Sequence, residues 1–151
     1  MKRNWKRAIP AVLICCVAAL LLAQFVPLRL VWLLPGRSVQ DAAYEVRQQS
    51  RYASAQFLPV SPADAAALSD LLAHTTVSFS GFAGDLDFEP AGATPYQVAV
   101  FPSDDRYYDL WTQGETLYVA RGRWTLRVRA PEAVYGAVDA AYQAARAAAA
   151  A

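Results

Sequence analysis

The residues most suited to binding chemistry lie between Tyr96 and Arg129, in short segments where apolar and polar side chains alternate. Successive side chains of a strand point to opposite faces of its sheet, so this alternation predicts one inward and one outward face. The expected inward set is Val98, Val100, Tyr108, Leu110, Leu117, Val119, Trp124, Leu126 and Val128. The outward set is Phe101, Tyr107, Trp111, Tyr118, Arg127 and Arg129. Aromatic residues and arginine are enriched in interface hot spots, so the outward set is the candidate binding face.

A covered sheet face is the alternative to an exposed binding face. Small domains with large sheets often bury both faces in part, and the N-terminal hairpin, the long loop before Tyr96 or a dimer partner could lie over the outward set. The two interpretations differ in one consequence. Replacing Trp111 or Arg127 with alanine would destabilise the fold if the face is covered, and would spare it if the face is exposed.

Three carboxylates alternate with apolar residues in the loop before Tyr96, at Asp85, Asp87 and Glu89. In an extended conformation they would share one face, and hard cations such as calcium are bound by oxygen clusters of this kind. The spacing is not that of an EF-hand loop, and acidic loops are commonly just solvated. A metal site at these residues is therefore a remote alternative, and we expect no cofactor.

His74 is the only histidine in the chain, which argues against most metal centres and against a Ser-His-Asp triad. It ends a predicted helix, where a capping or dipole-facing role is common for histidine. No nucleophile and base can be paired from the sequence. We therefore expect a protein without enzymatic activity, with an envelope hydrolase as the remote alternative.

An apolar run near the N-terminus determines the predicted location of the chain. Residues 8–26 are apolar except for Gln24, and at 1.5 Å per residue such a helix nearly matches a hydrocarbon core of roughly 30 Å. Four cationic side chains precede the run, which favours an inside N-terminus by the positive-inside bias. We predict a single-pass signal-anchor in the cell membrane with the remaining chain outside. Secretion after signal cleavage is the alternative.

Charge and cysteine content narrow the remaining classes. From Gly36 onward the chain carries nine arginines against thirteen acidic residues and no lysine, which leaves a net charge of −4. Phosphate binding needs a basic surface, so we expect no nucleic-acid partner. Cys15 and Cys16 are adjacent within the apolar run and cannot easily bridge to each other. The folded domain must then depend on its hydrophobic core.

The predicted fold class is α+β, with an N-terminal transmembrane helix followed by one small domain built on an antiparallel sheet. Its parts are a basic cytoplasmic N-terminus (1–7), the transmembrane helix (8–28), a juxtamembrane linker (29–42), an extracytoplasmic domain (43–146) and an alanine tail (147–151). In the domain we expect a hairpin (43–49 with 53–60), a helix (62–74), a strand (75–82), a four-stranded meander (96–101, 107–112, 116–121, 124–129) and a closing helix from Pro131. Ser38 followed by Asp41 could instead start a helix in place of the hairpin.

This order of elements resembles small bacterial envelope domains, membrane-anchored and often lipoproteins. The resemblance covers roughly residues 43–142, includes the last meander turn Gly122-Arg123-Trp124, and is one of pattern. It implies a bacterial, extracytoplasmic location and brings no catalytic residues. The residues before Cys16 are not the small ones of a lipoprotein signal, which puts lipidation in doubt.

Together these expectations describe a membrane-tethered extracytoplasmic binding module of the cell envelope. Its partners would be the membrane, through residues 8–28, and an envelope protein, peptide or wall component, through the outward face. The alternative is a structural accessory subunit that docks through its transmembrane helix on another membrane protein, since Ala18, Ala19 and Ala23 offer small-residue packing.

Overall fold

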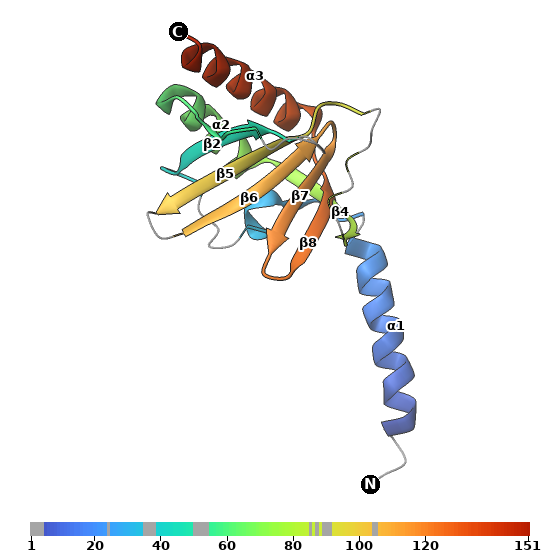
Figure 1. The fold of residues 1–151 in the computed structure, drawn as a ribbon. Coiled ribbons are helices and arrows are strands. Elements are labelled where there is room, and N and C mark those ends of the chain that lie inside the picture. Colours follow the sequence, from blue (N-terminus) through green and yellow to red (C-terminus); the bar gives the residue numbers. More distant parts are fainter. Residues whose placement is uncertain are drawn as a thin grey trace.

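The computed structural model describes residues 5–23, 25–34, 39–49, 55–84, 86, 88, 92–103 and 106–151. Its helices are α1 (Trp5–Ala23), α2 (Pro62–His74) and α3 (Glu132–Ala149), with a short 3-10 turn η1 (Leu30–Trp32). Its strands are β1 (Leu28–Arg29), β2 (Ala43–Gln48), β3 (Leu58–Pro59), β4 (Thr76–Ala83), β5 (Tyr96–Ser103), β6 (Arg106–Gln113), β7 (Thr116–Arg121) and β8 (Trp124–Arg129). All eight strands form one antiparallel sheet in the order β1-β4-β8-β7-β6-β5-β2-β3 (Figure 1).

Local sequence signals account for most of these boundaries. Helix α2, β7 and β8 occupy the predicted ranges, and β5 and β6 extend one or two residues further than predicted. The Ser61 hydroxyl caps α2 by accepting a hydrogen bond from the Asp64 backbone N–H at 3.2 Å. Gly114 and Gly122 close the meander turns with φ values of 55° and 61°, which glycine adopts without steric penalty. The predicted meander and the capped helix are thus confirmed.

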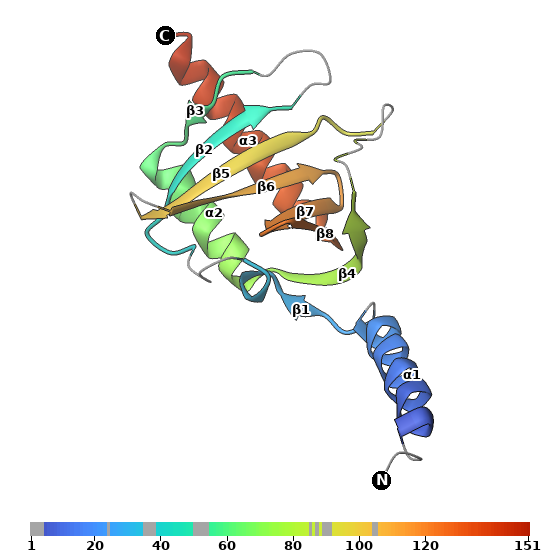
Figure 2. The ribbon, with the colours of Figure 1, turned by 60° about the horizontal axis from the view of Figure 1, so that its bottom comes forward.

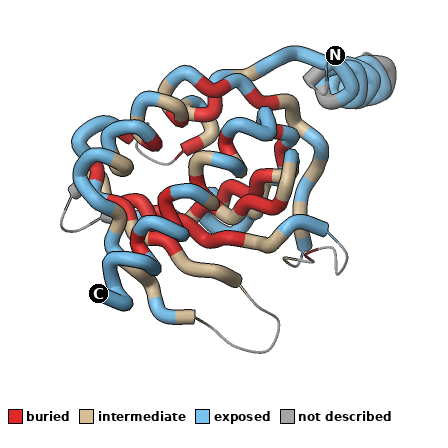
Figure 3. The backbone as a smooth tube through the Cα atoms, turned by 90° about the horizontal axis from the view of Figure 1, so that it is seen from above, coloured by how far each residue is buried: buried red, intermediate tan, exposed pale blue. Residues whose placement is uncertain are grey.

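One hydrophobic core lies between the sheet and the two helices α2 and α3. Its fully buried side chains come from both layers, and they include Val46, Val100, Val119 and Val128 of the sheet and Leu72 and Val134 of the helices. The face of α3 that packs on the sheet is buried at Val134, Val138, Ala141, Tyr142 and Ala145. In Figure 3 the buried residues gather in the centre of the domain, whereas the described part of α1 is exposed along its length.

The predicted transmembrane helix is wrong. In the parts of the chain that the structure describes, no helix is long and apolar enough to cross a membrane. The physical reason lies in where α1 ends. It stops at Ala23, and Leu28 already pairs with Val77 in the sheet, so the stretch from Ala8 to Ala23 spans only about 24 Å. The fold class is therefore corrected to one domain with a single antiparallel sheet of eight strands and three α-helices among the described residues. The transmembrane, single-pass and signal-anchor descriptions are wrong, whereas the predicted antiparallel sheet is confirmed.

The residues that follow α1 pack against the domain. Leu30, Leu34 and Val39 are buried in the core, and the Leu30 N–H donates to the Thr75 carbonyl at 2.9 Å. This part of the predicted linker therefore contributes to the sheet and its core.

The hairpin prediction for the next segment is confirmed, because β2 and β3 pair antiparallel. The helix alternative at Ser38 and Asp41 is wrong in its described part. Asp41 lies in a turn with a φ of 57°, and the strand begins at Ala43; Ser38 lies outside the described residues.

Candidate functional site

The face of the sheet opposite the helices carries a continuous row of large side chains. Backbone pairing aligns one residue from each of five strands: Arg47 with Gln97, Gln97 with Trp111, Trp111 with Tyr118, and Tyr118 with Arg127. Aligned residues on one face of an antiparallel sheet lie about 5 Å apart at Cβ, so neighbours in the row can touch. We call this arrangement the outer row. Three of its five residues belong to the predicted outward set.

At the β2 end of the outer row, polar side chains satisfy one another. The Arg47 Nε donates to the Gln97 Oε1 at 2.7 Å, and the guanidinium carbon lies 4.4 Å from the centroid of the Phe57 ring. Burial raises the pKa of the Asp109 carboxyl, while the Gln97 hydrogen bond and the Arg47 charge act in the opposite direction. Gln97 is itself only 5% exposed. This end is a closed polar cluster and offers little to a ligand.

At the β8 end, a pocket of about 470 Å³ opens on the outer face. Three residues of the predicted outward set line it, namely Tyr118, Arg127 and Arg129, together with Ser80, Gln113, Glu115 and loop residues Gly92 and Ala93. The loop is held in place by the Gln113 side-chain amide, which donates to the Ala93 carbonyl at 2.8 Å. The structure thus brings half of the predicted set together in one concave site, which we call the arginine pocket.

The two arginines of this pocket differ in their charge partners. Arg129 forms an ion pair with Glu115, with the Nε and Nη2 atoms 2.8 and 2.7 Å from one carboxylate oxygen. Arg127 instead reaches across the neighbouring strand, where its Nη2 donates to the Ser80 carbonyl at 3.4 Å. Among the described residues it has no acidic partner. Within the described residues the Arg127 guanidinium is therefore left for a carboxylate, which it can bind through two parallel N–H donors.

The comparisons with known proteins give no relative. No protein-family model matches the chain, and neither the curated proteins nor the solved structures contain a significant match. The resemblance to bacterial envelope domains therefore stays a prediction.

The other residues of the predicted outward set lie away from the arginine pocket. Trp111 is half-buried in the middle of the outer row. Phe101 and Tyr107 pair at the far end of β5 and β6, with ring centroids 5.9 Å apart, and Tyr107 is 67% exposed.

The face is also partly covered, as the alternative interpretation expected for the long loop. Phe88 packs edge-on against Tyr118, with ring centroids 5.9 Å apart, and leaves Tyr118 only 6% exposed. The arginines of the pocket stay exposed.

An exposed aromatic cluster lies on the helix-facing side of β4 and β8. Trp124 was predicted to be buried there, and this is wrong, because α2 and α3 pack mainly on β2, β3 and β5 and leave Trp124 57% exposed. The Trp124 ring lies 5.6 Å from that of Phe82, and the Phe82 ring lies 5.3 Å from that of Phe79. The aromatic residues of 75–82 and the alternation of 124–129 predicted the strands, but not that the helices would stop short of them.

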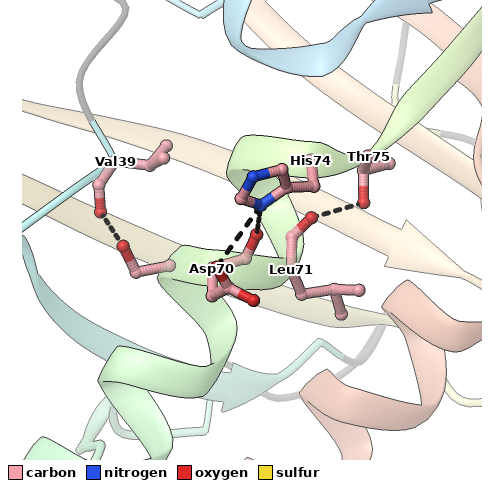
Figure 4. Close-up of polar contacts among 6 residues, drawn as sticks. Val39, Asp70, Leu71, His74 and Thr75 are labelled. Carbon is pink, nitrogen blue, oxygen red and sulfur yellow. Dashed lines mark hydrogen bonds and ion pairs between the residues drawn. The ribbon is translucent and has the colours of Figure 1, made fainter.

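For the remaining candidates, the described residues show no site. Asp85, Asp87 and Glu89 lie outside the described residues, and the described ranges hold no group of three possible metal ligands. His74 ends α2 as predicted (Figure 4). Its Nδ1 lies 2.9 Å from the Asp70 carbonyl and 3.3 Å from the Asp70 carboxylate, in an exposed pair.

A larger, open groove of about 1170 Å³ runs between α2 and the β2–β3 edge. Asp41, Glu45 and Asp70 line it, so its charge suits a cation rather than a carboxylate. Two of its lining residues, Ser69 and Tyr44, donate hydrogen bonds from their hydroxyls to the Val39 carbonyl at 2.7 and 2.8 Å. Phe101 borders the groove, and no other residue of the predicted outward set does.

Proposed function

We propose that the protein is a binding module that recognises a carboxylate-bearing envelope protein, peptide or wall component through the arginine pocket. The observation that carries this proposal is the position of Arg127. Its guanidinium lies at the rim of a concave site, and no acid among the described residues neutralises it. The envelope location stays a prediction from the sequence pattern, and a transmembrane tether is not part of the proposal.

The surroundings of Arg127 favour recognition over catalysis. The Ser80 hydroxyl donates to the Arg127 carbonyl at 3.0 Å, which fixes the backbone beneath the guanidinium. The Arg129–Glu115 pair makes the wall beside it nearly neutral. A binding site needs preorganised donors and a shaped surface of this kind. An enzyme also needs a nucleophile or a proton-transfer group beside the ligand, and here the Ser80 hydroxyl and the Glu115 carboxylate are already engaged by the Arg127 carbonyl and by Arg129.

The test is a nuclear magnetic resonance titration of the full chain with N-acetyl-diglutamate amide. We expect shifts of the Ser80, Tyr118 and Arg127 amides, with N-acetyl-dilysine amide producing none. Arg127→Ala should weaken binding about tenfold or more, because it removes a charge-assisted pair. Arg146→Ala, an exposed arginine near the end of α3, should leave the affinity unchanged. Equal shifts with both dipeptides, or no loss in Arg127→Ala, would contradict the proposal.

A further inference from the structure

Among the described residues, the strand β4 has a free edge beside the arginine pocket. On one side it pairs with β8, but on the other side β1 covers only Thr76 and Val77. Figure 2 shows β4 continuing well past β1. Among the described residues, the stretch 78–83 has no strand on its outer side, and Gly81, Phe82 and Ala83 keep regular pairing with β8. A strand edge of this kind presents backbone donors and acceptors to any extended chain.

The protein's own chain cannot fill this place by extending β1. Pro27 precedes Leu28, has no N–H to donate to a ladder, and leads away from the sheet toward α1. The space beside 78–83 is therefore adjacent to β1 but separate from it.

The two faces of the free edge differ in chemistry. On the helix side, Phe79, Phe82 and Trp124 form the exposed aromatic cluster, with Phe82 and Trp124 each 57% exposed. On the outer side, Gly81 has no side chain, and a Cβ there would meet nothing within 4 Å. Arg127 pairs with Gly81 and extends over β4 as far as the Ser80 carbonyl, so it places a positive charge at the edge.

A β-bulge between Phe79 and Gly81 bends the strand, and bulges often protect edges. Here the Ser80 carbonyl at the bulge accepts a hydrogen bond from Arg127 of the neighbouring strand β8. The guanidinium thus lies over β4 at the bend, and among the described residues Gly81, Phe82 and Ala83 have no strand on their outer side.

We propose that an extended peptide with alternating apolar and acidic side chains adds to the free edge of β4 as a further strand. Side chains of an added strand alternate between faces, so the apolar set would contact the aromatic cluster and the acidic set would lie near Arg127. This inference rests on the proposed function, because it identifies the carboxylate partner of the arginine pocket as a strand. A second copy of this chain fits less well, since pairing two β4 edges about a twofold axis would bring both Arg127 charges to one interface.

The test is calorimetric titration of the full chain with an acetylated, amidated peptide of about eight residues that alternates valine and glutamate. Two matched peptides carry N-methyl groups, one on every valine and the other on every glutamate. In a strand the N–H groups of alternate residues point to opposite sides, so only one of the two modified peptides can keep its edge hydrogen bonds. We expect one to bind at least about tenfold more weakly, and the other within about threefold of the parent. Equal affinities of the two N-methyl peptides would overturn strand addition.

Protein variants locate the peptide. Phe82→Ala should weaken binding about tenfold by removing an aromatic contact, whereas Trp32→Ala, which removes the 52% exposed aromatic residue of η1, should have no effect. If N-acetyl-diglutamate amide binds but the two N-methyl peptides have equal affinities, strand addition is wrong and the arginine pocket remains the proposed carboxylate site. No binding of either probe would reject both proposals. A dimer that Phe82→Ala dissociates, without peptide binding, would identify a second copy as the occupant and overturn the inference.

Discussion

The two halves of the sheet differ in how completely the rest of the chain covers them. In the half formed by β2, β5 and β6, helices α2 and α3 close one face, and Arg47, Gln97 and Asp109 satisfy one another on the other. In the half formed by β4 and β8, the helix side exposes an aromatic cluster, the outer side presents Arg127, and most of one edge has no neighbour among the described residues. The first half stabilises the fold, whereas the second half leaves surface exposed that a partner can bind.

This difference indicates that residues of the same type have different roles in the two halves. Arg47 and Arg127 stand in the same outer row, but Arg47 stacks on Phe57 and donates to Gln97, whereas the hydrogen bond that the Arg127 guanidinium makes among the described residues goes to a backbone carbonyl. Matched substitutions in the two halves test this difference. Those in the first half should lower the free energy of unfolding, whereas those in the second half should weaken binding.

The largest expected effect is on the core of the covered half. Leu72 is 2% exposed, so Leu72→Ala should lower the free energy of unfolding by about 2–5 kcal/mol through lost burial and a cavity. Leu126 is only half-buried, and Leu126→Ala should lower it by about 1 kcal/mol. Urea unfolding of both variants measures the difference. Equal losses would show that the β8 half is as tightly packed as the other.

An intermediate effect separates the two arginines of the outer row. Arg47→Ala removes a hydrogen bond, an aromatic contact and the charge beside Asp109, so we expect a loss of about 1–3 kcal/mol at neutral pH. Arg127→Ala should change stability by no more than about 0.5 kcal/mol. A loss in Arg127→Ala as large as that in Arg47→Ala would mean that both ends of the row are structural.

The pH dependence of this effect follows from Asp109. Burial raises the pKa of its carboxyl, so the folded protein takes up this proton at a higher pH than the unfolded chain does. The contribution of Asp109 to stability is then greatest when it is protonated, and falls as the pH rises from about 4 through the raised pKa. Arg47→Ala removes an opposing cation and should steepen this fall. The loss of unfolding free energy caused by Arg47→Ala should therefore become smaller as the pH falls toward about 4. In an Asp109→Asn background, this loss should not depend on pH.

The sequence predicted the parts of the fold that depend on local chemistry. Helix α2 and strand β8 lie at the predicted residues, because capping by Ser61 and the side-chain alternation from Trp124 to Arg129 act within a few residues. It did not predict where the helices would end on the sheet, so Trp124 was placed in the core. Nor did it show that the chain after α1 would join the sheet as β1, since that pairing depends on a partner almost 50 residues away.

The candidate site was predicted in part, for a related reason. Pleat parity identified Tyr118, Arg127 and Arg129 as outward residues, and these line one pocket. The free edge of β4 was not foreseen, because an edge is a property of strand order, which depends on long-range pairing.

The smallest expected effect is at the aromatic cluster of the open half. Phe82 is 57% exposed and contacts other aromatic rings that are themselves outside the core, so Phe82→Ala should change the free energy of unfolding by no more than about 0.5 kcal/mol. The same variant should weaken peptide binding. Phe82 would then contribute to binding and not to the stability of the fold. Thermal and urea unfolding of the free protein measure the first quantity. A loss above about 2 kcal/mol would instead mean that Phe79, Phe82 and Trp124 act as a second core, and the open half would then belong to the folding machinery as fully as the half under the helices.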